Sequence, residues 1–390
     1  MSGASLFRWS AAGALIAHAL QLLATDGLHG GGDLKPHLRL IQLMGEGPAL
    51  RSVYAPLYHG LGALVSPLSG LAAYPEWFAW FSMAGLIAAF RLFQRSTALP
   101  DESAALFCWA PYHFALTGCL PKIEAAGYAL ALVGLSLLWK RRHAFAALTL
   151  ALTFTVHTAA ALFLGLAGGV LGLALRDPRA LLALAAGTAL ALPLFLAHLA
   201  AGCSPAEALL FSQGDYLRAA PRLANLEQWH RILVLSNPLA LVAAGFGARA
   251  LWRQQRPLAV LCLLVTGLYL NEAWLAPFGA RTTLDLMRGL TLFAIPVAIA
   301  GGMAVASRRA LATALVAASA VLSLAAALWV VPESCVSKPI ALAEISGFDV
   351  NRCTFRWRRG ARTSGRRAEP AQIRTDRGVE GATPREGALQ

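Results

Sequence analysis

The stretch AFAALTLALTFTVHTAAALFLGLAGGVLGLAL, from Ala144 to Leu175, contains no Asp, Glu, Lys or Arg. An apolar segment of about 20 residues is enough for one helix to cross a bilayer, so this stretch is too long for one ordinary span. His157 and Thr158 interrupt it near the middle. The sequence therefore predicts two short helices that meet near His157.

Apolar segments recur along most of the chain. It has 390 residues, of which 57% are hydrophobic and 14% are charged, whereas a soluble protein carries about 25% charged residues. Repeated segments rich in Leu and Ala favour helices, because backbone groups in lipid must be satisfied internally. We therefore expect an all-α membrane protein, a polytopic bundle of about 11 (11–13) transmembrane helices. The expected spans are residues 7–25, 74–93, 104–120, 125–139, 144–157, 158–175, 179–200, 231–248, 257–276, 286–306 and 310–331.

Basic residues gather in the short loops between these segments, and cytoplasmic loops of membrane proteins are enriched in Lys and Arg. With the spans above, the following residues fall on one side: Arg91, Arg95, Lys140, Arg141, Arg142, Arg176, Arg179, Arg249, Arg253, Arg256, Arg308 and Arg309. The N-terminus is therefore expected in the cytoplasm and the first outer loop, residues 26–73, on the opposite side. A spanning helix at 53–73 would break this agreement, so a surface-lying or re-entrant helix is expected there.

Charge and composition also divide the chain into parts. Residues 1–331 are expected to form the transmembrane domain and residues 332–350 a segment on the outer side. Residues 351–390 contain ten arginines and few apolar residues, so this tail is expected to be disordered and to lie on the outer side. The formal net charge of +13 follows from these loops and the tail, and the expected partner is the lipid bilayer, not nucleic acid. No CxxC spacing is present, so the cysteines predict neither a zinc site nor a redox motif.

Asp33 stands between a run of three glycines and a short helix that contains Pro36 and His37. One interpretation is an N-cap, because Asp before a first turn with Pro is a common helix start. The other is a general base that accepts a proton from an acceptor hydroxyl at the outer surface. Asp33 and His37 are four residues apart and share one helix face. Both interpretations can hold, because a capping Asp can still face a cleft.

Three further polar residues lie at the ends of expected spans. His157 is either a buried residue bonded to a backbone carbonyl or a group that faces a functional interior, since His within lipid is costly. Arg281 and Arg288 are seven residues apart and would share a helix face. Arginine there suits a phosphate group through paired hydrogen bonds, and the alternative is contact with lipid headgroups.

Four short motifs resemble GT-C type membrane glycosyltransferases. DLKPHLRLIQLMGEG at 33–47, followed by YAPLYHG at 54–60, resembles their first outer loop. In that superfamily the loop forms juxtamembrane helices, carries the acidic catalytic residue and continues with a Tyr-Pro-Pro-like element and a His. TFTVHTAAALFL at 153–164 is similar to their short-helix pair, with His-Thr in place of the frequent His-Pro. MRGLTLFAIPVAIAGGMA at 287–304 resembles their late Arg-bearing helix.

The resemblance implies an inverting transfer of a sugar from a polyprenyl-phosphate donor, on the outer face of the bacterial inner membrane. The acceptor is a glycan, a lipid or a protein. Asp33 matches the catalytic carboxylate, and His37 on the same helix face is expected to be the second catalytic residue. Arg288 matches the donor-phosphate ligand. The other matching positions, expected to bind substrate or donor, are Arg281, His157, Tyr54 and His59. No metal-ligand set is identified, and a divalent metal cofactor is left open. Relatives often end in a folded outer domain, which the arginine-rich tail does not resemble.

Two alternatives stand beside the glycosyltransferase. A secondary transporter or permease would show internal repeats and broken helices with polar groups near the midplane. The sequence has no clear internal repeat, and its polar groups cluster at the outer ends of the spans. The second alternative is a non-catalytic component of the same fold that serves cell-envelope polysaccharide assembly.

Overall fold

The computed structural model describes residues 2–24, 34–45, 55–71, 73–118, 123–200, 229–275 and 289–334. Within these ranges every regular element is an α-helix and no strand occurs. The chain forms two compact units, Met1–Arg356 and Trp357–Gln390. The second unit lies outside the described residues, as does the whole tail 351–390 that is expected to be disordered. Of the expected outer segment 332–350, residues 332–334 belong to the last described helix and the rest lie outside the described residues.

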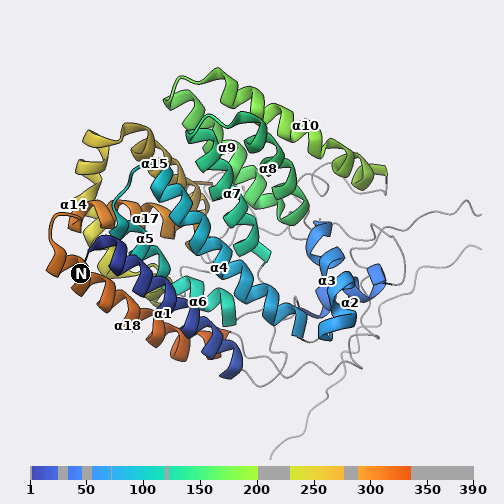
Figure 1. Cartoon of the computed structure of the whole chain (residues 1–390), viewed down its shortest axis with the longest axis horizontal. Helices are drawn as coiled ribbons and strands as arrows, with labels where there is room; N and C mark the ends of the chain where they lie inside the picture. The colour runs from blue at the N-terminus through green and yellow to red at the C-terminus, as the bar shows by residue number, and fades with distance from the viewer. Residues whose placement is uncertain are drawn as a thin grey trace, which may run out of the picture. The chain divides into compact units, whose positions relative to one another are not determined.

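The helices of the first unit are shown in Figure 1. They are α1 (Gly3–Ala24), α2 (Leu34–Gly45), α3 (Pro56–Ser69), α4 (Ala73–Ser96), α5 (Asp101–Cys108), α6 (Pro111–Gly118), α7 (Ile123–Trp139), α8 (His143–Val156), α9 (Thr158–Ala174), α10 (Pro178–Ala200), α13 (Trp229–Leu235), α14 (Pro238–Gln254), α15 (Arg256–Tyr269), α16 (Asn271–Leu275), α17 (Leu290–Val305) and α18 (Arg309–Ser334).

The two short helices expected to meet at His157 are present as α8 and α9. His157 lies between them with an extended backbone, φ −158° and ψ 111°. Its Nδ1 accepts a hydrogen bond from the backbone N–H of Ala160 at 3.2 Å. An N-cap residue has this backbone conformation, and its side chain accepts a hydrogen bond from a backbone N–H in this way. The long apolar stretch is therefore divided because His157 caps α9.

Three other expected spans are also divided into two helices. The span at 104–120 is formed by α5 and α6, because Pro111 lacks a backbone N–H and disfavours helical backbone at Ala110 before it. The span at 231–248 is interrupted between α13 and α14 at Asn237, a left-handed residue with φ 58°. The Oδ1 of Asn237 accepts from the N–H of Ala240 at 3.3 Å and starts α14. The span at 257–276 is divided between α15 and α16 at Leu270.

In the ranges that the structure describes, full-length spans are fewer than the expected 11. Three helices in the described ranges are long and apolar enough to cross a membrane: Gly3–Leu23, Pro178–Ala197 and Arg309–Leu328. Five others, α7, α8, α9, α15 and α17, are apolar but have 14 to 17 residues. These shorter helices correspond to the expected spans at 125–139, 144–157, 158–175, 257–276 and 286–306.

The core is formed where helices approach closely through small residues. α14 and α17 pack so tightly that a Cβ placed at Gly247 would overlap the backbone carbonyl of Ala300. A Cβ at Gly302 of α17 would likewise overlap Ser103 of α5. Close helix packing of this kind depends on small residues at the contact.

Helices α2 and α3 lie beside each other at one end of α4 (Figure 1). Leu38, Tyr58, Tyr74, Ile123 and Val156 form one apolar cluster there with Ile41, so the start of α7 and the end of α8 share that end. The turn after α7 lies at the other end of that helix. It is about 25 Å from the end near α2 and α3, given the 17 residues of α7 and the rise per residue of a helix.

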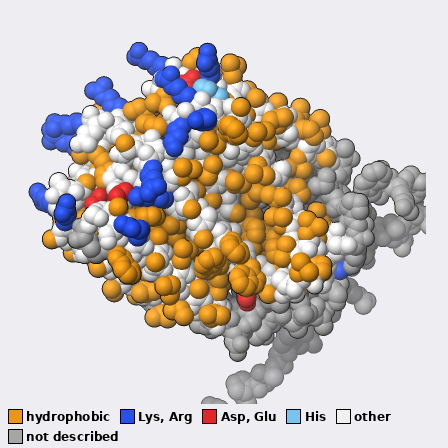
Figure 2. Space-filling model, viewed as in Figure 1, with side chains coloured by type: hydrophobic (Ala, Val, Ile, Leu, Met, Phe, Trp, Pro, Cys, Tyr) orange, Lys and Arg blue, Asp and Glu red, His pale blue; other side chains and the backbone are white. Residues whose placement is uncertain are grey.

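Figure 2 shows most of the Lys and Arg side chains in view gathered along one edge of the molecule, with hydrophobic side chains over the centre.

Candidate functional site

Helices α2 and α3 carry two of the sequence-predicted site residues, His37 and His59. The two helices pack against each other, and each turns one face toward the other. On α2 that face is formed by His37, Leu38 and Ile41, at the three- and four-residue spacing of one helix side. On α3 a Cβ at Gly62 would lie 2.8 Å from side-chain atoms of Ile41 and Tyr74. The missing side chain at Gly62 therefore lets α3 approach α2 closely.

His37 and His59 meet inside this contact. The Nδ1 of His37 lies 2.8 Å from the Nε2 of His59, and the two residues are 7% and 1% exposed. The Nδ1 of His59 lies 3.3 Å from the carbonyl oxygen of Ala55. A carbonyl only accepts, so His59 donates through Nδ1, and its neutral ring accepts through Nε2. The N–H at Nδ1 of His37 is then the donor to His59, and the tautomer of the neutral His59 ring is fixed.

The burial of His59 determines its charge. Burial lowers the pKa of His59 well below its usual range, and the neighbouring His37 lowers this pKa further, while the Ala55 carbonyl partly opposes both. His59 is therefore neutral at ordinary pH, in agreement with the tautomer given by the hydrogen bonds. A neutral histidine of fixed tautomer orients a neighbouring helix without bringing a buried charge.

Aromatic rings surround the histidine pair. Tyr58 lies edge-on to both rings, at centroid distances of 5.8 Å to His37 and 5.2 Å to His59. The hydroxyl of Tyr74 donates to the backbone carbonyl of Tyr58 at 2.7 Å, which joins α4 to α3. Sequence reasoning did not identify Tyr58 or Tyr74 as part of the site. The adjacency of Tyr58 to His59 in YAPLYHG was the only available signal.

His157 stands one residue beyond the same cluster, because Val156 is a member of it. Its ring is edge-on to Tyr128 of α7 at 6.0 Å. A Cβ placed at Gly127 would lie 2.6 Å from the Cβ of His157, so α7 packs closely against this junction. His157 is half-buried, and its Nδ1 caps α9 by accepting from a backbone N–H.

The remaining predicted site residues, Asp33, Tyr54, Arg281 and Arg288, lie outside the described residues. In the sequence Asp33 directly precedes α2, Tyr54 precedes α3 by two positions, and Arg288 directly precedes Gly289, the N-cap of α17. In the parts of the chain that the structure describes, no group of three or more His, Cys, Asp or Glu residues could hold a metal ion.

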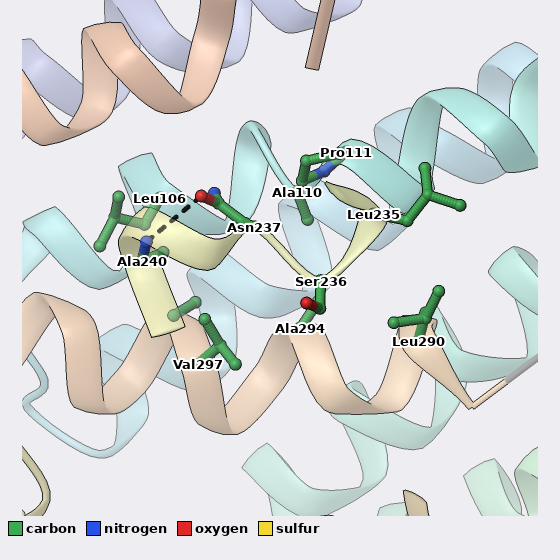
Figure 3. Close-up of a pocket in the computed structure, with 11 residues that line it drawn as sticks. Leu106, Ala110, Pro111, Leu235, Ser236, Asn237, Ala240, Leu290, Ala294 and Val297 are labelled. Atoms are coloured by element: carbon green, nitrogen blue, oxygen red, sulfur yellow. Dashed lines mark hydrogen bonds between the residues drawn. The ribbon is translucent and has the colours of Figure 1, made fainter. Parts of the chain in front are cut away.

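A small cavity lies elsewhere, where the breaks between α5 and α6 and between α13 and α14 face α17 (Figure 3). Its volume is about 10 Å³, the room that about one water molecule needs. Near it, the Nδ2 of Asn237 donates to the carbonyl of Trp109 at 3.5 Å, and the hydroxyl of Ser323 donates to the same carbonyl at 2.7 Å. The cavity is far too small for a sugar or a lipid, which need about 300 Å³ or more.

The site is therefore a buried, hydrogen-bonded histidine pair that fixes α2 on α3, with His157 at the edge of the same cluster. Comparisons of the chain with protein-family models, with curated proteins and with solved structures gave no match.

Proposed function

We propose that this chain is a polytopic membrane glycosyltransferase of the GT-C type that takes its sugar from a polyprenyl-phosphate donor. The single observation that supports it best is the contact between His37 and His59. These residues come from the two motifs that resemble the first outer loop of such enzymes. Helices α2 and α3 pack on the ends of α4, α7 and α8, as juxtamembrane helices would at the mouth of a bundle.

The proposed reaction uses groups at the ends of these helices. Asp33 takes the proton of the acceptor hydroxyl while the oxygen of that hydroxyl attacks the anomeric carbon of the sugar. The bond from that carbon to the phosphate oxygen breaks on the opposite face, so the configuration inverts. The polyprenyl phosphate leaves as an anion, and Arg288 holds it through the paired N–H groups of its guanidinium.

The histidine pair acts in this scheme as a positioning element. His37 lies one helical turn after the start of α2, and Asp33 directly precedes that start. The hydrogen bond to His59 and the buried Leu38 and Ile41 fix the first turns of α2 on α3. Asp33 therefore directly precedes a helix whose orientation the buried pair determines. A general base must be held in a defined position to act, and this helix would provide it.

The membrane setting follows the same reasoning. We place the chain in the bacterial inner membrane, with the arginine-bearing turns in the cytoplasm and with α2, α3 and the tail on the outer side. Residues 1–331 then form the transmembrane domain, with α2 and α3 as its juxtamembrane helices. The acceptor is a glycan, a lipid or a protein that reaches the outer face.

The experiment uses the full chain, purified and reconstituted in lipid nanodiscs with a panel of polyprenyl-phosphate sugars. The readout is release of polyprenyl phosphate from each donor, because this product forms whichever acceptor is used. We expect release with at least one donor and reduced release in the His59→Leu variant. Absence of release across the panel, with the protein folded, contradicts catalysis and favours a non-catalytic component of envelope polysaccharide assembly.

A second candidate, a secondary transporter, is favoured by the paired helix breaks beside Asn237 and Trp109. Transporters bind substrates and ions at discontinuous helices near the midplane. The cavity at these breaks has a volume of about 10 Å³, which limits an occupant there to about one water-sized species. Uptake of labelled solutes into proteoliposomes along an imposed proton or sodium gradient would distinguish this candidate from a transferase.

A further inference from the structure

Two turns at the end of the bundle opposite to α2 and α3 have the same backbone geometry. In the first, the N–H of Arg142 donates to the carbonyl of Leu137 at 2.8 Å and the N–H of Arg141 to that of Leu138 at 2.9 Å. In the second, Asp177 and Arg176 make the matching bonds: Asp177 donates to Gly172 at 2.8 Å and Arg176 to Leu173 at 3.0 Å. Both are Schellman motifs, which end α7 and α9.

Each motif has an arginine at the position that glycine usually occupies. Arg141 has φ 55° and Arg176 has φ 53°. A side chain with a Cβ is strained in this left-handed region, whereas glycine is not. The turn after α4 has the same geometry with Ala98 at φ 54°, so the backbone does not itself require arginine. Strained residues point to a role for their side chains, and the shared feature of Arg141 and Arg176 is charge.

The two turns are joined to each other. The Nε2 of His143, the first residue of α8, lies 2.8 Å from the Oδ2 of Asp177. The Oδ1 of Asp177 accepts from the backbone N–H of Arg179 at 3.1 Å. The carboxylate of Asp177 is thus engaged by the turns themselves, and it holds them side by side.

The joined turns carry a concentrated positive charge. Every Lys and Arg between residues 125 and 200 lies in them, and Asp177 is the only acidic residue in that range. The five cationic side chains are exposed: Lys140, Arg141, Arg142, Arg176 and Arg179. Helix α8 also begins here without a side-chain cap and without an acidic residue in its first turn, so its N-terminal N–H groups add to the positive potential.

Exposed apolar side chains continue from the charged turns along the helices. Phe145 is 59% exposed and Leu148 is 57% exposed on α8, and Leu182 is 69% exposed on α10. A soluble phosphate compound would bind the positively charged turns but would leave this apolar surface in contact with water. A phospholipid would cover both, with its phosphate at the turns and its acyl chains along α8 and α10.

We propose that the α7–α8 and α9–α10 turns form a binding site for the phosphate headgroup of an anionic phospholipid, with Arg141 and Arg176 as its principal ligands. Guanidinium groups bind phosphate through paired hydrogen bonds, and basic recesses between membrane helices on the cytoplasmic side bind such headgroups. The site lies at the other end of the bundle from α2 and α3 and does not depend on the proposed sugar transfer.

The test measures lipid binding to the full chain in detergent by native mass spectrometry. The probes are diphosphatidylglycerol, phosphatidylcholine and inorganic pyrophosphate, which separates a lipid site from a site for soluble phosphate. The double variant Arg141→Gly/Arg176→Gly removes both ligands and relieves both strained positions. We expect about fivefold weaker diphosphatidylglycerol binding for each arginine, or about 25-fold in all, with a lipid-free melting temperature at or above that of the wild type.

Two matched controls accompany the double variant. Ala98→Gly relieves the same strain without a change of charge, and it should leave lipid binding unchanged. Arg249→Gln/Arg253→Gln removes two exposed charges from the end of α14, and it should weaken binding by less than about twofold. Equal losses of diphosphatidylglycerol binding in the two charge-removing variants would mean that the lipid binds to diffuse surface charge. That result would overturn the proposal. Pyrophosphate or phosphatidylcholine binding as tight as that of diphosphatidylglycerol would overturn it as well.

Discussion

Replacing either histidine of the buried pair should loosen α2. His37→Leu and His59→Leu each remove the hydrogen bond of 2.8 Å between two buried rings and keep an apolar side chain of similar size. The net contribution of such a bond is about 1 kcal/mol. This corresponds to about a fivefold increase in the population of the open state, so the amides of α2 should exchange hydrogen about five times faster in either variant.

The double variant carries the stronger test. If the two histidines contributed independently, the combined effect would be the product of the two, or about 25-fold. Because they interact with each other, replacing both by apolar residues should cost no more than replacing one. Exchange in the double variant should therefore be equal to or slower than that of the single variants.

Hydrogen exchange measured by mass spectrometry on peptides from α2 gives all four rates. Peptides from α10, which lies outside the cluster of α2 and α3, serve as the internal control and should be unchanged. Effects of the two substitutions that simply multiply would refute the coupling. An unchanged rate in α2 would refute the claim that the pair holds this helix.

Three further predictions concern pH, packing and topology. Because the pKa of His59 is lowered on folding, its stabilising effect is complete above the unfolded value of 6.5 and is lost as the pH falls below it, so the protection of α2 amides, relative to their intrinsic exchange rate at each pH, should fall between pH 6.5 and 5. Gly247→Ala, which overlaps the Ala300 carbonyl, should destabilise the fold by about 1–3 kcal/mol in urea-induced unfolding. In a cysteine-free background, cysteines at Gly214 and Gln254 should label from opposite sides of the membrane.

Each of these has a control or a contrary outcome. His59→Leu should abolish most of the pH dependence, and a dependence that persists would assign it to another group. Gly245, with nothing within 4 Å of an added Cβ, should tolerate alanine and gain up to about 1 kcal/mol from helix propensity. A cysteine at Asp33 should label together with that at Gly214, and labelling together with Gln254 instead would reverse the orientation.

The sequence predicted the helical class and the break at His157. These follow from local signals: apolar length and a polar residue inside an apolar stretch. The breaks at Ala110 and Asn237 were missed, although Pro111 and Pro238 follow them directly. Both prolines lie inside apolar stretches, and apolar length alone does not reveal where a helix within such a stretch ends.

The contact between His37 and His59 could not be predicted from spacing alone. They are 22 residues apart, and their meeting depends on Gly62 leaving room for Ile41 and Tyr74. Likewise, the bond between His143 and Asp177 joins residues 34 positions apart. Long-range contacts of this kind depend on how the helices pack, which sequence periodicity does not determine.

The proposed transfer rests on the carboxylate of Asp33, and the Asp33→Asn variant tests it most directly. Asn caps a helix about as well as Asp but cannot take up a proton. The variant should therefore keep the melting temperature of the wild type and release polyprenyl phosphate about a hundredfold more slowly, the usual scale for losing acid–base catalysis. Full release by Asp33→Asn would contradict the account: Asp33 would then serve only as a cap, and the general base would have to be sought at Asp215, Glu272 or Asp285.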